Sequence, residues 1–264
     1  MNLGLQNKTA VVSGSTAGIG LAIATTLAAE GATVVVNGRT EARVTSALQK
    51  IRQSVANADV RGVAADLGTS AGVEAFLKQV PEADVLVNNL GIFEVKPFAE
   101  IPDADWLRFF EVNILSGVRL TRKYLPGMLQ KNWGRIIFIS SESGQQIPAE
   151  MIHYGMTKTA QIAIARGLAE SVAGTGVTVN SVLPGPTASE GASEFVERFA
   201  KQQNISKGEF EKQFFEKVRP SSLLKRFETT EEIAAVVAFV ASTQAVAING
   251  AAVRAEGGVI RSIV

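Results

Sequence analysis

The stretch "TAVVSGSTAGIG", residues 9–20, decides the fold, because a buried-strand pattern runs directly into a glycine-rich turn and then a helix pattern. Residues 9–13 form a short apolar run, typical of a strand that is covered on both faces. Gly14, Gly18 and Gly20 then permit a tight turn, a close approach of the backbone to a ligand, and close packing of the helix on the strand. On its own the pattern does not identify a ligand, since any turn from strand to helix favours glycine.

The same alternation of strand and helix continues along the chain. Further strands are predicted at 33–37, 59–64, 85–88, 135–140, 177–182 and 251–254, and helices at about 19–30, 41–55, 70–80, 103–125, 154–173 and 229–241. Such an alternation indicates right-handed βαβ crossovers. We therefore expect an α/β fold, a doubly wound Rossmann-type parallel sheet of about seven strands with helices on both faces. No linker or repeat interrupts the pattern, which predicts one domain over residues 1–264.

Composition excludes several classes of function. Hydrophobic residues make up 46% of the chain and the formal net charge is +1, so a substantial core is expected and no overall field attracts nucleic acid or an anionic membrane. The chain has no cysteine and one histidine, which excludes disulfides and leaves no metal site expected. No signal peptide is recognisable, and the apolar run 233–241 is about half a membrane span. We expect a cytoplasmic protein.

The position of the glycine turn suggests its ligand. The spacing is G-x-x-x-G-x-G, which differs from the common dinucleotide fingerprint and from the phosphate-binding P-loop. After the first strand of a doubly wound sheet, however, the free N–H groups at the helix start suit the pyrophosphate of a dinucleotide. The second strand ends in "VVVNGRT" (34–40), with no carboxylate for a ribose and with Arg39 available for a 2′-phosphate. This favours NADP(H) over NAD(H), unless Arg39 is simply a solvated side chain ahead of a helix.

Four residues farther along suggest acid–base chemistry. Tyr154 and Lys158 are four positions apart, which places both on one face of a helix. A lysine ammonium one turn away would lower the pKa of the phenol. Ser141 follows a predicted central strand, so its hydroxyl points into the crevice where ligands bind in this architecture. Asn113 lies inside a helix pattern, where asparagine is unfavourable unless its side chain has a specific role.

Taken together, these motifs resemble one known family. The three glycines, "NNLG" (88–91), Asn113, Ser141, "YGMTK" (154–158) and "NSVLPGPT" (180–187) occur in the order and spacing of the short-chain dehydrogenase/reductase family. The resemblance covers about residues 5–260. Two departures are mild: Ser13 stands where the family usually has threonine, and Leu90 where it usually has alanine.

The resemblance implies a role for each catalytic candidate. Tyr154 would be the general acid in carbonyl reduction and the base in alcohol oxidation. Lys158 would bind the nicotinamide ribose and lower the pKa of the tyrosine. Ser141 would orient the substrate oxygen, and Asn113 would hold a water that links Lys158 to solvent through a local helix distortion.

The resemblance also implies a set of cofactor-binding residues. Asp66, which follows the third strand, would sit beside the adenine or would lead the next helix as a cap. The full set, besides Tyr154 and Lys158, is Gly14, Ser15, Thr16, Gly18, Ile19, Gly20, Arg39, Asp66, Leu67, Asn88, Gly91, Pro184, Gly185 and Thr187.

The expected function is therefore an NADP(H)-dependent oxidoreductase that interconverts a ketone or aldehyde and an alcohol. A 3-oxoacyl group, a polyol, a sugar acid and a small carbonyl compound are all possible substrates. The alternatives are an NAD-dependent alcohol dehydrogenase and a dinucleotide-binding regulatory protein without catalysis. The polar segment 186–226 is expected to form a substrate lid, or else a peripheral pair of helices. The resemblance implies a homotetramer, and His153 is expected at the surface or the pocket rim.

Overall fold

A single parallel sheet organises the molecule. The computed structural model describes residues 2–263. Seven parallel strands follow one another in the order β3-β2-β1-β4-β5-β6-β7. Their bounds are Thr9–Val12 (β1), Thr33–Gly38 (β2), Val60–Ala64 (β3), Val85–Asn88 (β4), Gly134–Ile139 (β5), Val177–Pro184 (β6) and Ala252–Ala255 (β7). The chain reverses its direction of winding between β1 and β4, which are neighbours, and this switch point is where ligands bind in such sheets.

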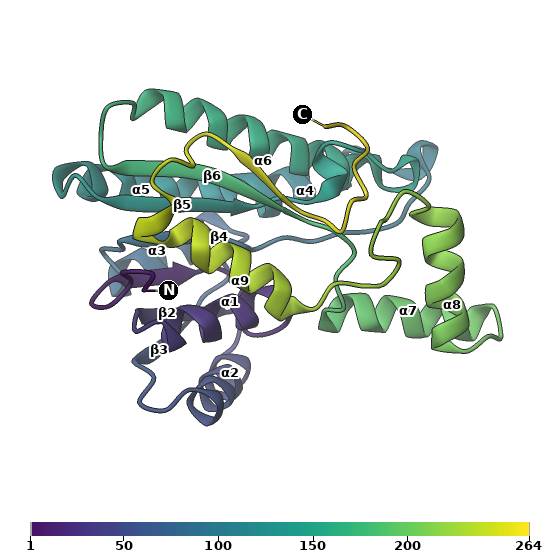
Figure 1. The fold of residues 1–264 in the computed structure, drawn as a ribbon, viewed down its shortest axis with the longest axis horizontal. Coiled ribbons are helices and arrows are strands. Elements are labelled where there is room, and N and C mark those ends of the chain that lie inside the picture. The colour runs from purple at the N-terminus through teal and green to yellow at the C-terminus, as the bar shows by residue number, and fades with distance from the viewer. Residues whose placement is uncertain (1, 264) are drawn as a thin grey trace.

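Helices cover both faces of the sheet, as predicted. One face packs against α1 (Gly18–Ala29), α2 (Glu41–Ser54) and α9 (Thr230–Ala241), and the other against α3 (Ser70–Gln79), α5 (Ser116–Gln130) and α6 (Ile152–Ser171). Figure 1 shows α1 and α9 side by side over the first face. The strands are continuously apolar because alternate residues serve both cores: Val34 and Val36 pack on one side, and Val35 on the other.

The helix predicted over residues 103–125 is interrupted. It consists of α4 (Asp103–Phe110), a π-helical turn over Glu111–Leu115, and α5, which continues to Gln130. A π turn has one extra residue in its hydrogen-bonded ring, so it widens the helix and displaces its carbonyl groups. Here the widened turn is centred on Asn113, one of the predicted site residues.

The segment between β6 and α9 stands apart from the two helical layers. It contains α7 (Glu190–Gln202), α8 (Lys207–Gln213) and a second π-helical turn over Phe214–Val218. Figure 1 shows α7 and α8 at the side of the sheet, beyond one end of α9. We call residues 186–226 the lid segment. Among residues 2–263, no helix is both long and apolar enough to cross a bilayer.

Candidate active site

The glycine turn has the geometry of a dinucleotide cradle. Gly14 and Gly18 have φ values of +62° and +54°, a region that side chains other than glycine rarely adopt. A Cβ atom at Gly20 would lie 2.5 Å from the Asn89 side chain and from the Gly14 carbonyl oxygen. The N-cap of α1, Ala17, makes no side-chain cap hydrogen bond. An anionic pyrophosphate would therefore meet a close backbone and uncapped N–H groups, so the cradle fits the predicted cofactor.

Two of the predicted cofactor residues in the turn have structural contacts. Ser15 is buried: its Oγ donates to the Val12 carbonyl oxygen at 2.6 Å and accepts from the Asn37 N–H at 2.9 Å. Thr16 faces Gly38, where a Cβ atom would lie 2.4 Å from the threonine methyl carbon. These contacts hold the glycine turn against β2, so both residues support the backbone of the cradle.

The end of β2 carries an amide where a carboxylate would favour NAD. Asn37 accepts from the Gly14 N–H at 3.2 Å and donates to the carbonyl oxygens of Val63 and Ala65, which joins the glycine turn to β3. Arg39 follows β2 and is exposed. This position leaves the guanidinium accessible to a phosphate.

Asp66 and Leu67 lie at the end of β3. The Asp66 carboxylate is exposed and accepts from the Gly68 N–H at 3.0 Å. The side chain that caps α3 belongs to Thr69, so Asp66 leads the helix without being its N-cap. Leu67 is buried in the core. Of the two, only Asp66 presents its side chain at the surface.

At the end of β4, neighbouring asparagines face in different directions. Asn88 is buried and donates to the Thr121 hydroxyl in α5 at 3.2 Å, and its Oδ1 has no hydrogen-bond partner in the described part of the chain. Asn89 donates to the carbonyl oxygens of Ser13 and Gly14 at 3.0 and 3.1 Å. Sequence reasoning selected Asn88 and missed Asn89, although side chains alternate along extended backbone and one of the pair had to face the turn.

Lys158 and Tyr154 lie on one face of α6, as their spacing predicted. The Lys158 ammonium donates to the Ile139 carbonyl oxygen at 2.8 Å and to the Gln161 amide oxygen at 3.2 Å, and it lies 5.5 Å from the centre of the Tyr154 ring. Burial lowers the pKa of Lys158 to about 7. It also raises the pKa of Tyr154 above its usual range. The phenol is therefore protonated at neutral pH, and a lowering of its pKa by Lys158 stays a prediction for the cofactor-bound protein.

Asn113 joins three parts of the site. Its side chain accepts from the Ile92 N–H at 2.8 Å and donates to the Ile92 carbonyl oxygen at 2.9 Å and to the Thr157 hydroxyl at 3.0 Å. Its own carbonyl oxygen accepts from the Gln161 side chain at 2.7 Å, because the π turn turns it out of the helix. The helix distortion that the family resemblance implied is thus present. A Cβ atom at Gly91 would lie 3.5 Å from the Lys158 ammonium, so this glycine borders the same cluster.

Two cavities meet at Ser141 and Tyr154. A cavity of about 230 Å³ lies between the glycine turn and α6, and Ile19, Asn89, Gly91, Lys158, Pro184, Gly185 and Thr187 also line it. A larger cavity of about 720 Å³ lies beneath the lid segment. It shares Phe93, Ser141, Tyr154, Gly185 and Thr187 with the smaller one, and its other walls include Phe210, Phe214 and Phe227. The arrangement suits a cofactor and a substrate that meet at the tyrosine.

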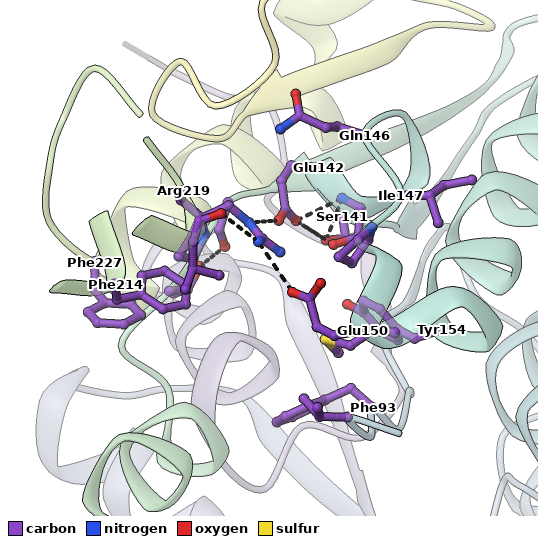
Figure 2. Close-up of a pocket in the computed structure, with 18 of the residues that line it drawn as sticks. Phe93, Ser141, Glu142, Gln146, Ile147, Glu150, Tyr154, Phe214, Arg219 and Phe227 are labelled. Carbon is purple, nitrogen blue, oxygen red and sulfur yellow. Dashed lines mark hydrogen bonds and ion pairs between the residues drawn. The ribbon is translucent and has the colours of Figure 1, made fainter. Parts of the chain in front are cut away.

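A buried charged pair beside Ser141 was missed by sequence reasoning. The Glu142 carboxylate accepts from the Ser141 hydroxyl and from the Arg219 Nε, the latter at 3.0 Å. Figure 2 shows Arg219 reaching from the lid segment toward Glu142 and Glu150. The only available signal for Glu142 was its place directly after Ser141 at a strand end. Arg219 gave no signal, since it is one of many charged residues in a polar segment.

The prediction that His153 lies at the surface or the pocket rim is wrong. The imidazole has no exposed surface, and its ring centre lies 4.1 Å from that of Phe109 and 6.0 Å from that of Trp106. The reason is that α4 packs on α6 and covers this side of the helix. Burial lowers the pKa of His153, so it is neutral near pH 7.

Comparison with known proteins places this geometry in a family. The sequence profile of the short chain dehydrogenase family matches residues 8–199. The chain is 49% identical to the oxidoreductase YvaG of Bacillus subtilis over the full length of both, and 34% identical to D-beta-hydroxybutyrate dehydrogenase of Cupriavidus necator over 96% of this chain and 98% of that one. L-sorbose reductase from Gluconobacter frateurii, solved with NADPH and L-sorbose, superposes over the whole of both chains with a TM-score of 0.94 and 30% identity. The chain therefore belongs to the short chain dehydrogenase family of oxidoreductases.

Proposed function

We propose that the protein is an NADP(H)-dependent oxidoreductase that reduces a ketone or aldehyde to an alcohol, with Tyr154 as the general acid. The observation that carries this proposal is the position of Ser141 and Tyr154 on the shared wall of the two cavities, with Lys158 directly behind them. A bound NADPH would supply the hydride. The chain itself would supply the proton, the orientation of the carbonyl group and the exclusion of water.

Each residue of the cluster has a distinct part in that chemistry. Burial keeps the Tyr154 phenol protonated at neutral pH, so it is ready to donate to a carbonyl oxygen. The Ser141 hydroxyl would hold that oxygen beside the phenol. Lys158 is held by the Ile139 carbonyl oxygen, and Asn113 holds both the loop at Ile92 and the start of α6. The resulting cluster has little freedom to rearrange, which is what a positioned proton donor requires.

The walls of the larger cavity favour a compact, hydroxylated substrate. Near the catalytic residues it is lined by polar side chains, among them Gln146, Glu142 and Glu150, whereas the lid segment contributes the aromatic residues Phe210 and Phe214. The Glu150 carboxylate, whose side chain is 43% exposed, and the Gln146 amide can form hydrogen bonds with substrate hydroxyl groups. We therefore favour a small polyhydroxy ketone over a long 3-oxoacyl chain. The L-sorbose held by a structural neighbour is a substrate of that chemical kind.

The preference for NADP(H) rests on the end of β2. The buried Asn37 side chain is used within the fold, no carboxylate is there to bind the ribose, and Arg39 is exposed next to it. Solved relatives in this family contain NADPH, which supports the same cofactor here.

The test is a steady-state assay of NADPH consumption against a panel of carbonyl compounds. The panel contains L-sorbose, other small hydroxyketones, a simple diketone, a 3-oxo acid and a 3-oxoacyl thioester. We expect turnover with the hydroxyketones, a preference for NADPH over NADH, and weaker activity with the thioester. Tight binding of NADPH without turnover of any carbonyl would instead favour a regulatory dinucleotide-binding protein.

We also propose a homotetramer in the cytoplasm. The exposed apolar side chains of Leu107 and Phe110 on α4, with 69% and 43% of their surface accessible, support a subunit contact on this side of the molecule. Light scattering in solution is expected to give four times the mass of the chain. A monomer mass would refute the proposal.

A further inference from the structure

The lid segment places a largely buried cation, Arg219, at the active site. Arg219 follows the π-helical turn that ends the lid helices, and its Nε lies 3.0 Å from Glu142 Oε1. Its Nη1 lies 3.6 Å from Glu150 Oε1. The side chains of Arg219 and Glu142 are only 11% and 5% exposed. Figure 2 shows that the guanidinium lies between the two carboxylates, at the edge of the larger cavity.

The other oxygen of Glu142 contacts the catalytic serine. Oε2 accepts from the Ser141 hydroxyl, from the Ser143 N–H at 2.8 Å and from the Ser143 hydroxyl at 3.0 Å. A hydroxyl group has one proton and two lone pairs. Ser141 donates its proton to Glu142 and accepts from the Ser143 N–H at 3.1 Å, so one lone pair is left for the Tyr154 hydroxyl, with which Ser141 interacts. A continuous chain of contacts thus runs from Arg219 through Glu142 and Ser141 to Tyr154.

We propose that Arg219 and Glu142 form a positioning pair. Through this pair the lid segment, when it covers the cavity, orients the Ser141 hydroxyl and determines the electrostatic field at the Tyr154 hydroxyl. The proposal rests on the function proposed above. It predicts that closing the cavity and preparing the proton donor are one event, since the same lid residue does both. A lid that lacked Arg219 would close the cavity over a buried, unpaired carboxylate.

The electrostatics of the site agree with this geometry. The Glu142 carboxylate raises the pKa of Tyr154, and the Arg219 guanidinium lowers it. The other charged groups around the pair are Lys158 on α6, Glu150 ahead of α6, and Lys217 and Glu228 on and after the lid helices. These groups are unchanged in the variants below, so a shift in the titration of Tyr154 reports on the pair itself.

The direct test measures the pH at which Tyr154 ionises. Carbon-13 NMR of ring-labelled tyrosine, recorded as a pH titration in the presence of NADP⁺, reports this ionisation. The chain has only two tyrosines, and Tyr154→Phe identifies which signal belongs to the site. Glu142→Gln is expected to lower the pH at which Tyr154 ionises by about one unit, and Arg219→Met to raise it by a similar amount. Arg226→Met is the matched control, because this lid arginine pairs with Glu232 outside the cavity; it is expected to leave the titration unchanged.

Kinetics give a second readout. Arg219→Met is expected to lower kcat for carbonyl reduction about tenfold, and Arg219→Lys to recover part of the loss. If all variants titrate as the wild type does and Arg219→Met raises only KM, the pair is merely a clamp and the proposal is overturned. The NMR titration needs no substrate, so it judges the pair even if the wild type turns over no carbonyl and the proposed function fails. If Arg219→Met does not fold, the Tyr154 titrations of Arg219→Lys and Glu142→Gln still test the proposal.

Discussion

The base of the active site and the lid segment above it are built in opposite ways. At the base, Ser141 follows a central strand, Lys158 and Asn113 are buried, and each side chain has defined hydrogen-bond partners. The lid segment consists of short helices whose charged residues form exposed pairs, such as Lys207 with Glu197. The base is therefore rigid enough to hold reacting groups, whereas the lid can vary at little cost to the fold. We therefore propose that the base holds the reacting groups and that the aromatic residues of the lid segment select the substrate, whereas Arg219 is the lid residue that acts on the base.

Removing the proposed proton donor should have the largest effect. Tyr154→Phe keeps the ring but deletes the hydroxyl, and we expect kcat to fall by about 10²–10⁴-fold on every carbonyl substrate. NADPH affinity, measured by fluorescence titration, should change little. Tyr124→Phe is the matched control, because this second tyrosine is buried and donates to the Val80 carbonyl oxygen away from both cavities. Comparable turnover in Tyr154→Phe and the wild type would contradict the assignment.

Lys158→Met should separate activity from stability. Activity is expected to fall about 10²-fold, because the proposed ribose contact and proton path through the lysine would be lost. Burial lowers the pKa of Lys158 from 10.5 to about 7, so between these values the unfolded chain binds more protons than the folded one. The contribution of Lys158 to the free energy of unfolding of the wild type therefore rises as the pH increases from about 7 to 10.5.

Urea unfolding of the wild type and Lys158→Met at pH 7 and pH 10 measures this contribution. From pH 7 to pH 10, the free energy of unfolding should rise less in the variant than in the wild type. An identical pH dependence in both proteins would show that burial of the lysine does not oppose its charge.

Replacing an aromatic residue of the lid segment should alter substrate selection more than the chemical step. Phe214 lines the larger cavity and stacks on Phe227 with ring centres 5.2 Å apart. Phe214→Ala is expected to raise KM about tenfold and to change the ranking of substrates, with kcat for the best substrate nearly retained. Leu223→Ala, an exposed residue outside the cavity, is the control. A loss of kcat with unchanged KM would mean that Phe214 contributes to the chemical step, and it would contradict the proposed separation of roles between lid and base.

Cofactor choice is expected to depend on one exposed cation. Arg39→Ala should weaken NADPH binding roughly tenfold, in line with the loss of one charge-assisted contact to a phosphate, and leave NADH binding almost unchanged. Arg43→Ala removes a nearby arginine that pairs with Glu190, and a smaller effect is expected. Equal affinities of the unmutated protein for NADPH and NADH would refute the preference.

The smallest effect should come from His153. Both ring nitrogens are buried without a hydrogen-bond partner among the described residues, so His153→Leu is expected to raise the free energy of unfolding by about 1 kcal/mol. Burial lowers the pKa of the folded histidine, so wild-type stability from this group falls as the pH drops below about 6.5. Thermal unfolding at pH 7 and pH 5.5 should show that the variant loses less stability on acidification. A steeper loss in the variant would mean that the folded protein stabilises the charged imidazole.

Much of the base was predictable because local signals and fold rules agree there. Apolar strands had to alternate with helices, the glycine turn had to follow β1, and side chains at strand ends had to meet at one edge of the sheet. Thus Ser141, Tyr154 and Lys158 come together as expected, and the preference for NADP(H) agrees with the cofactor found in solved relatives.

Other features depend on packing that no local pattern records. Asn88 points toward α5 whereas Asn89 faces the glycine turn, which depends on where β4 ends. His153 is buried because α4 covers it. The pairing of Arg219 with Glu142 joins residues 77 positions apart through the fold of the lid. Such contacts between a loop and a distant strand end are set by tertiary structure, and periodicity cannot reveal them.

The division between base and lid is tested most directly by measuring kcat and KM for the wild type, Tyr154→Phe and Phe214→Ala across one panel of carbonyl compounds with NADPH. We predict that Tyr154→Phe loses kcat uniformly and keeps the wild-type order of substrates. We also predict that Phe214→Ala keeps kcat for its best substrate and reorders the panel through KM. Uniform loss of kcat in the lid variant, or near-normal turnover in Tyr154→Phe, would contradict this division.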